Sequence, residues 1–357
     1  MQPTMDRRHM IGLLGASTAF GVASRWAAAA APLQTAAAKS ALSFPAGATI
    51  RTVLTDVPPD SLTKATLFHE HLSFEWARVA PQSNRSGPAK DAAPVLEQVE
   101  AAAADGVGCI VDAGTTDVGR DTDLLKQIAS RTSVHIVACG GLYMERTYPA
   151  DVGSKSEEQI AEDLVREARA NRYGAFGEIG ESPNAAMSEI ERKVFRSVGR
   201  AHLRTRLPIF THNAYGTGPN VPKDAGLKQL DAFESVGVSP DRVAIGHSCC
   251  LDDPAADVIK QIAKRGAYVG FDRVTGGLVP DDKKVAMILA FLAAGHADRL
   301  LLSADYNFTA RSAARPGYAV TLTMFAPKLR QAGVSEEMLR RITIDNPRRF
   351  LAFVPVA

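Results

Sequence analysis

The sequence predicts an α/β protein folded as a single (β/α)₈ barrel, the TIM-barrel architecture. Eight short apolar runs alternate with segments of helical length, which is typical of this fold. Polar residues end many of these runs, so they do not gather at the single crevice of an open sheet. An open doubly wound sheet is the competing fold, but no Gly-x-Gly-x-x-Gly loop follows the first run.

The eight expected strands are continuous apolar runs more often than alternating ones. Continuous runs are typical of parallel strands whose outer face is covered by helices. The predicted strands are residues 65–71, 108–114, 134–141, 174–180, 207–212, 242–247, 267–272 and 299–305.

Segments with helical spacing of apolar residues lie between these strands. Ser156 precedes Glu157 and Glu158, which is a helix start with acidic residues in the first turn. Ser188 and Glu191 have the spacing of a capping box. The expected helices are residues 92–104, 121–131, 156–171, 192–205, 226–236, 254–265, 281–294 and 335–343.

Composition argues against several classes of partner. The formal net charge of the 357 residues is +2, which gives no support to nucleic-acid or polybasic membrane binding. No apolar run in the body of the chain is long enough to span a bilayer. Four cysteines are too few for a disulfide framework, so we expect Cys109 and Cys139 to be buried thiols. The adjacent Cys249 and Cys250 follow a candidate ligand and could approach it.

The N-terminus has the pattern of a targeting segment. Residues 1–31 combine the Arg7-Arg8 pair, a mildly apolar stretch and an alanine-rich run, which predicts a twin-arginine export signal and a periplasmic protein. The alternatives are a plain alanine-rich leader or a start at Met5. Residues 32–48 are expected to be a linker, and 49–357 the barrel domain.

Side chains of the types that bind metals close five of the predicted strands. A strand alternates its side chains, so the two histidines of His-Glu-His point to the same side. In a barrel the C-terminal strand ends meet at one mouth, where six such residues can surround two metal ions. The candidate ligands are His69, His71, Glu178, His212, His247 and Asp305.

The charges of these residues fit a pair of divalent ions. A carboxylate at the end of an apolar strand is costly to bury alone, but Glu178 could bridge two cations with its two oxygens. Its alternative is an ion pair with Arg273. Two divalent cations opposed by Glu178 and Asp305 leave a positive remainder that attracts substrate oxygens. We expect zinc first, with manganese, cobalt, nickel or iron as alternatives, since nitrogen and oxygen ligands suit them all.

Several motifs, taken together, resemble those of the phosphotriesterase family of the amidohydrolase superfamily. They are Phe-His-Glu-His-Leu (68–72), Gly-Arg-Asp (119–121), Thr-His-Asn-Ala (211–214), Ile-Gly-His-Ser (245–248), Leu-Ser-Ala-Asp (302–305) and Ile-Asp-Asn-Pro-Arg-Arg-Phe-Leu (344–351). The resemblance extends from about residue 50 to the end. It implies that His69, His71 and Asp305 bind the more buried metal, and that His212 and His247 bind the more exposed one.

The resemblance also places Glu178 where many members carry a bridging carboxylated lysine, as in a branch with Gly-Glu-Ile-Gly. Phe-Asp-Arg (271–273) and Tyr143 are similar to lactonase residues, which implies that Arg273 and Tyr143 act on carbonyl substrates. Either residue could instead only pair or pack. Cys250 stands where phosphotriesterases have an acidic residue of a proton relay, which argues against efficient phosphotriester turnover.

These observations predict a hydrolase of small molecules that attacks a lactone or ester carbonyl, or a phosphoryl centre. Asp305 would accept the proton of the attacking water. The alternatives are an amidase for N-acyl compounds and a metal-binding barrel without catalysis. The resemblance further implies a homodimer.

Overall fold

The structure is a computed structural model that describes residues 42–81, 92–216, 221–307 and 317–356. The predicted export signal and residues 32–41 of the predicted linker lie outside the described residues. Within the described part, no helix combines the length and apolar character needed to cross a membrane.

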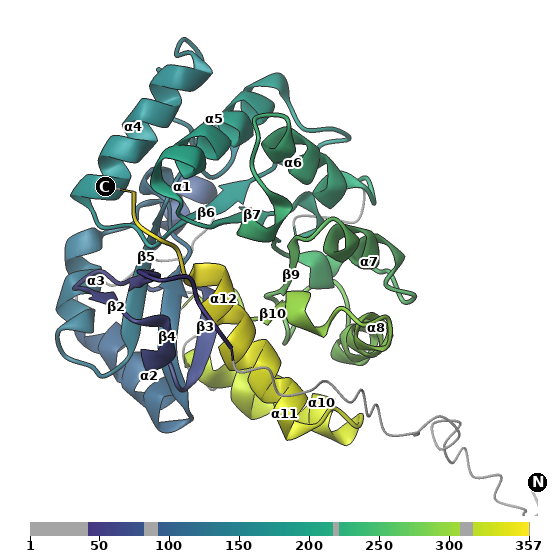
Figure 1. Cartoon of the computed structure of the whole chain (residues 1–357). Coiled ribbons are helices and arrows are strands. Elements are labelled where there is room, and N and C mark those ends of the chain that lie inside the picture. The colour runs from purple at the N-terminus through teal and green to yellow at the C-terminus, as the bar shows by residue number, and fades with distance from the viewer. Residues whose placement is uncertain (1–41, 82–91, 217–220, 308–316, 357) are drawn as a thin grey trace, which may run out of the picture. The chain divides into compact units, whose positions relative to one another are not determined.

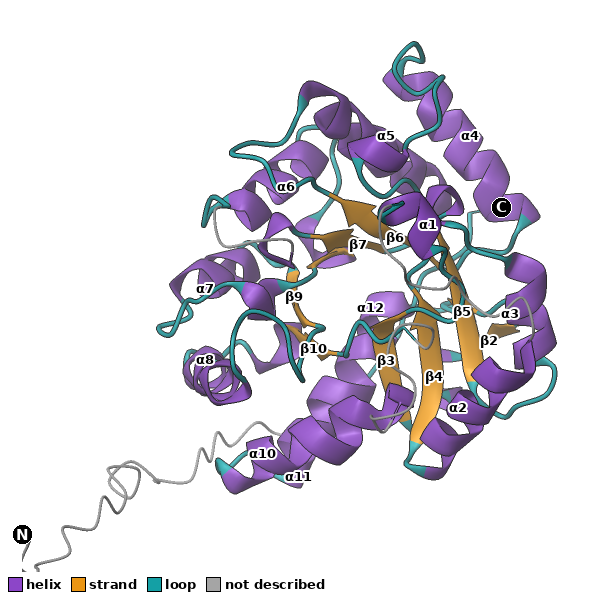
Figure 2. Ribbon diagram, turned by 180° about the vertical axis from the view of Figure 1, so that it is seen from behind, coloured by secondary structure: helices purple, strands orange, loops and turns teal. Residues whose placement is uncertain are grey.

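Eight parallel strands form the barrel, in the order in which they occur along the chain. Figure 2 shows them arranged around a ring with the helices outside. This arrangement confirms the predicted fold class. The strands are β3 (Ala65–Glu70), β4 (Val107–Asp112), β5 (His135–Gly140), β6 (Ala175–Gly180), β7 (Ile209–His212), β8 (Val243–Ile245), β9 (Tyr268–Phe271) and β10 (Leu300–Leu302).

The first and last barrel strands meet through contacts just beyond their ends. The amide of Asp305 donates to the carbonyl of His69 at 3.1 Å, and the amide of His71 donates to the carbonyl of Tyr306 at 2.9 Å. These bonds join the segment after β10 to β3. The residues that close the barrel are therefore next to, or identical with, the candidate ligands.

Helices cover the outside of the strands (Figure 1). Ser188 caps its helix with the capping box that the sequence predicted, and Ser156, predicted as a helix start, also has a complete capping box. The helical segment near the C-terminus continues beyond residue 343, where the prediction ended. A π-helical turn leads into a further helix at Asn346–Leu351, and Pro347 is tolerated in the first turn of that helix. The helices are α1 (Trp76–Val79), α2 (Ala92–Ala104), α3 (Thr122–Ala129), α4 (Glu157–Ala170), α5 (Glu189–Thr205), α6 (Ala225–Glu234), α7 (Asp257–Lys264), α8 (Asp281–Ala293), α10 (Ala326–Gln331), α11 (Glu336–Arg340) and α12 (Asn346–Leu351), with π-helical turns at Thr321–Phe325 and Arg341–Asp345.

A short antiparallel hairpin precedes the barrel and was not predicted. Its strands are β1 (Ile50–Arg51) and β2 (Asp56–Val57). Thr49 pairs with Phe353, so the start and the end of the barrel domain lie together. Two-residue strands carry too short a pattern to be recognised from sequence.

Two apolar clusters stabilise the barrel. The larger packs helices against the outer faces of the strands. The smaller fills the interior, where Phe68 and Phe210 meet edge to face with centroids 6.2 Å apart. Cys109 and Cys139 belong to this interior cluster as buried free thiols, as expected. The packed interior therefore supports the C-terminal ends of the strands, where the candidate ligands lie.

Candidate metal centre

All six candidate ligands lie together at the C-terminal ends of the strands. His69 is on β3, Glu178 is on β6, and His212 is the last residue of β7. His71 directly follows β3, while His247 and Asp305 lie two and three residues beyond β8 and β10. Five of the six side chains are buried and Asp305 is partly buried. The sequence prediction thus names a set of residues that the fold brings together.

The first ligand group consists of His69, His71, Glu178 and Asp305. His69 Nε2 is 3.2 Å from Glu178 Oε2, and His71 Nε2 is 3.3 Å from Glu178 Oε1. His71 Nε2 is also 3.0 Å from Asp305 Oδ1. The ligand atoms of the group all lie within 4.8 Å of one another, a spacing that allows one ion to contact them all.

The second group consists of Glu178, His212 and His247. His212 Nδ1 is 2.8 Å from Glu178 Oε2, and His247 Nε2 is 3.4 Å from the same oxygen. The two imidazole nitrogens are 2.8 Å apart. Glu178 is shared by both groups, so its carboxylate lies between two potential metal positions.

The donor set fits divalent metal ions. His69 Nε2 is buried and makes no hydrogen bond with any described residue, although it faces two carboxylates. A buried ring nitrogen in that situation is costly unless something else binds it. Imidazole nitrogens and carboxylate oxygens are common ligands of zinc and related ions. The residues present therefore fit two such ions.

The electrostatics of the protein residues alone point the same way. Burial lowers the pKa of His71, but hydrogen bonds to Asp305 and Glu178 outweigh it and raise the pKa to about 9. Burial lowers the pKa of His212 to about 4. Burial would raise the pKa of Glu178, yet the charges of His212 and His69 hold it well below its usual range. Glu178 thus stays ionised, which is the form of a carboxylate that binds a metal ion.

Asp272 is a functional residue that the sequence prediction missed. It follows β9, is fully buried, and places Oδ2 2.9 Å from His69 Nδ1 and Oδ1 2.9 Å from His247 Nδ1. The amide of His247 also donates to Oδ1 at 2.8 Å. Burial would raise the pKa of Asp272, but the charges of His247 and His69 lower it strongly. One carboxylate therefore orients one histidine from each ligand group.

Glu70 is the second residue that was missed. Its side chain points away from the two histidines beside it and accepts hydrogen bonds from Ser303 Oγ at 2.7 Å, the Ala304 amide at 2.9 Å and the Tyr306 amide at 2.7 Å. Burial raises the pKa of Glu70 to about 8. These bonds hold the backbone on both sides of Asp305. The sequence did carry a signal for Glu70, since its carboxylate stands between two ligand histidines.

Arg273 and Tyr143 both reach the ligand groups. Arg273 Nε lies 2.6 Å from Asp305 Oδ2, so its ion pair is with Asp305 and not with Glu178, the alternative considered from sequence. The Tyr143 hydroxyl lies 3.1 Å from His212 Nδ1. Burial raises the pKa of Tyr143 well above its ordinary value, so it remains a neutral hydrogen-bond donor.

The cysteine pair approaches the centre without joining either ligand group. The amide of Arg273 donates to Cys249 Sγ at 3.3 Å, and that sulfur is 4.0 Å from Asp272 Oδ1. Cys250 is 7% exposed. Cys249 therefore packs against residues beside the ligands, and neither sulfur belongs to the metal-binding groups that the described residues form.

Two ligands have an unusual backbone conformation. His247 and Asp305 have φ angles of 51° and 50°, in the left-handed region that non-glycine residues seldom adopt. Such conformations cost free energy and persist where surrounding contacts enforce them. The bonds from Asp272 to His247, and from Glu70 around Asp305, provide that enforcement.

Comparisons with known proteins agree with this geometry. A phosphotriesterase homology protein of Escherichia coli is 30% identical over 297 residues, covering 81% of this chain and 98% of the relative. A crystal structure of that protein with phosphate in its active site superposes with a TM-score of 0.74 and 29% identity, covering 81% of this chain and 99% of the other.

Two further relatives are named as hydrolases. An aryldialkylphosphatase of Saccharolobus solfataricus is 28% identical, covering 80% of this chain and 94% of the relative. An N-acetyltaurine hydrolase of Xenopus tropicalis is 26% identical, covering 85% and 98%. The sequence model of the phosphotriesterase family matches residues 48–351. The chain, a hydrolase with a histidine and carboxylate cluster able to bind metal ions, therefore belongs to the phosphotriesterase family.

Proposed function

We propose that this protein is a two-metal hydrolase that cleaves lactones or carboxylic esters. The observation that carries the proposal is the position of Glu178. Its carboxylate is within 3.4 Å of a nitrogen from each of His69, His71, His212 and His247. A two-oxygen group at the centre of four imidazoles is suited to bridging two cations, and zinc is the metal we expect first.

In this proposal His69, His71 and Asp305 would hold one ion, His212 and His247 would hold the other, and Glu178 would be a ligand of both. When bound, the ions lower the pKa of water toward neutrality and polarise a carbonyl oxygen. The surrounding protein residues would keep the ligands oriented and keep Glu178 and Asp305 ionised. One of them must also accept the proton that the attacking water loses.

Asp305 is the residue best placed to accept the proton that the attacking water loses. Its Oδ1 faces His71 and its Oδ2 faces Arg273 at 2.6 Å, so the carboxylate is fixed in orientation at the mouth. Arg273 would hold this carboxylate in place beside the substrate through their ion pair. Tyr143, beside His212, would donate a hydrogen bond from its hydroxyl to the substrate carbonyl.

The nature of the scissile bond is narrowed by the residues around the mouth. Cys250 in place of an acidic residue gives the phosphoryl reaction less support than the carbonyl reaction. An amidase acting on N-acyl compounds is the second candidate, and the similarity to N-acetyltaurine hydrolases favours it. The intact Asp305 argues against a barrel that only binds metal, since storage needs no proton acceptor.

A substrate panel combined with metal analysis tests the proposal. The purified protein should contain two divalent ions per chain and turn over lactones or aryl esters with a higher kcat/KM than N-acyl compounds or phosphotriesters. Activity should disappear on chelation and return on adding metal. Full activity after complete metal removal would refute the mechanism, while a preference for N-acyl compounds would favour the amidase.

Replacing Asp305 separates catalysis from metal binding. Asp305→Asn keeps an oxygen ligand but removes the proton acceptor, so turnover should fall by roughly 10²–10⁴-fold, the usual contribution of general acid–base catalysis. Metal content should remain near that of the wild type. Turnover within a few-fold of wild type, with metal retained, would exclude the proton-transfer role.

A further inference from the structure

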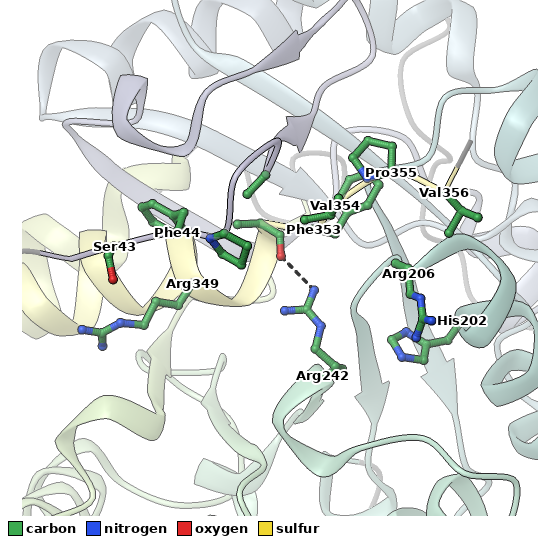
Figure 3. A pocket seen from close by; sticks show the side chains of 13 residues that line it. Ser43, Phe44, His202, Arg206, Arg242, Arg349, Phe353, Val354, Pro355 and Val356 are labelled. Atoms are coloured by element: carbon green, nitrogen blue, oxygen red, sulfur yellow. Dashed lines mark hydrogen bonds between the residues drawn. The ribbon is translucent and has the colours of Figure 1, made fainter.

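A pocket of about 530 Å³ lies on the face of the barrel opposite the metal centre. Arg206 follows α5 and Arg242 directly precedes β8, so both are at the N-terminal ends of strands. The C-terminal segment 352–356 and residues near Phe44 complete the lining (Figure 3). Its volume is in the range of small-molecule sites.

Two arginines in this pocket lack acidic partners. Arg242 is partly buried and donates to the carbonyl of Ala352 at 2.9 Å, but it has no carboxylate within ion-pair distance among the described residues. Arg206 likewise makes no ion pair and no side-chain hydrogen bond within that part of the chain. By contrast, Arg349 at the pocket's edge pairs with Asp298 at 3.2 Å. Guanidinium groups without carboxylate partners in a recess are suited to binding an anion.

His202 lies near both arginines. It is buried, lines the pocket, and uses Nδ1 to bond the carbonyl of Leu207 at 2.6 Å. Burial, followed by the nearby charges of Arg242 and Arg206, lowers the pKa of His202 to about 4 despite that hydrogen bond. The ring is therefore neutral at pH 7, and the positive charge of the pocket belongs to the arginines.

Apart from Ser43, the rest of the wall is apolar. Phe44, Phe353 and Val356 line it together with two prolines. Val354 and Val356 expose 42% and 53% of their surface, so this part of the wall presents uncovered apolar surface. A ligand with a charged head and an apolar body would cover these side chains while pairing with the arginines.

We propose that this pocket binds a small organic carboxylate with an apolar body, its head paired with Arg242 and Arg206 and its body against Phe44, Phe353 and Val356. The N-terminal residues that precede the described part of the chain are a poor alternative occupant of this pocket. Residues 1–41 contain four arginines and lysines against one aspartate, a net charge of +3. That charge would be repelled by the unpaired arginines.

Calorimetric titration of the full-length, metal-loaded protein with octanoate tests this proposal. We expect one octanoate per chain, and at least tenfold weaker binding of acetate, which lacks the apolar body. Arg206→Gln should weaken octanoate binding at least tenfold without affecting folding, because this exposed side chain bonds nothing among the described residues. Arg242→Gln should also weaken octanoate binding. Arg166→Gln, an exposed change on α4, is the matched control and should bind as the wild type does.

A second comparison separates this pocket from the metal centre, which could also bind a carboxylate. Octanoate binding should survive in Glu178→Ala, where the centre is damaged. The proposal is overturned if Arg206→Gln and wild type bind octanoate equally, if acetate binds as tightly as octanoate, or if Glu178→Ala abolishes binding while Arg206→Gln retains it.

Discussion

Replacing Asp272 with asparagine should weaken the binding of both metal ions together. Its Oδ2 is 2.9 Å from Nδ1 of His69 in one ligand group, and its Oδ1 is 2.9 Å from Nδ1 of His247 in the other. Asparagine has the same shape but one acceptor oxygen, so its amide group would face the N–H of one ring. One histidine would then lose its partner and its orientation, and the other would lose the charge assistance.

The size of the effect follows from these contacts. Residues that orient metal-bound histidines usually change metal affinity by roughly 10- to 100-fold. That range corresponds to about 1.4–2.8 kcal/mol per ion. Hydrogen bonds to charged groups contribute about 1.5–3 kcal/mol, which is the same range. Because Asp272 serves one histidine in each group, both dissociation constants should rise.

Competition with a chromophoric chelator measures the two dissociation constants, and elemental analysis after dialysis measures the ions retained. Asp298→Asn is the matched control, because its exposed carboxylate lies just before β10, away from the mouth. Wild-type affinity for both ions in Asp272→Asn would refute the orienting role. So would a loss of thermal stability in the metal-free protein with unchanged metal affinities, since that result indicates packing alone.

Three further predictions concern other parts of the barrel. Gly246→Ala should cost about 1–3 kcal/mol of stability, because a Cβ there would lie 2.0 Å from the Thr211 carbonyl; Gly153→Ala, with no atom nearer than 3.9 Å, is the control, and equal melting temperatures would contradict the clash. Metal loading should not depend on bicarbonate, since Glu178 is itself a carboxylate; faster loading with bicarbonate would exclude its bridging role. The contribution of His202 to the unfolding free energy should fall by about 3 kcal/mol as pH drops from about 6.5 toward 4, because the unfolded chain protonates His202 before the folded protein does; urea titrations of wild type and His202→Asn should therefore show a difference in unfolding free energy that changes over this range, and a difference independent of pH would contradict it.

The barrel and its ligands could be predicted because their signals are local. An apolar run identifies a buried parallel strand without knowledge of its neighbours, and a histidine or carboxylate at its end is visible in the same few residues. His212 at the end of β7 is one example. The fold then brings the strand ends together, so the ligand set follows from the strand assignment.

The residues that support the ligands could not be predicted in the same way. Asp272 was visible between Phe271 and Arg273, but its partners come from β3 and from the segment after β8. Their distance from Asp272 depends on how the strands tilt and how the barrel closes. The left-handed backbone of His247 and Asp305 also depends on such distant contacts.

Closure of the barrel and construction of the metal centre depend on the same contacts. No strand pairing joins β10 to β3 within the described residues, so closure there relies on the bonds of the segment that carries Asp305. That segment bonds β3 through the His69 carbonyl, and Glu70 holds it on both sides. A change that opens this junction must therefore displace Asp305 from the histidines. Conversely, an ion bound by Asp305 together with His69 and His71 would join the two strands, so metal binding should stabilise the whole barrel as well as the site.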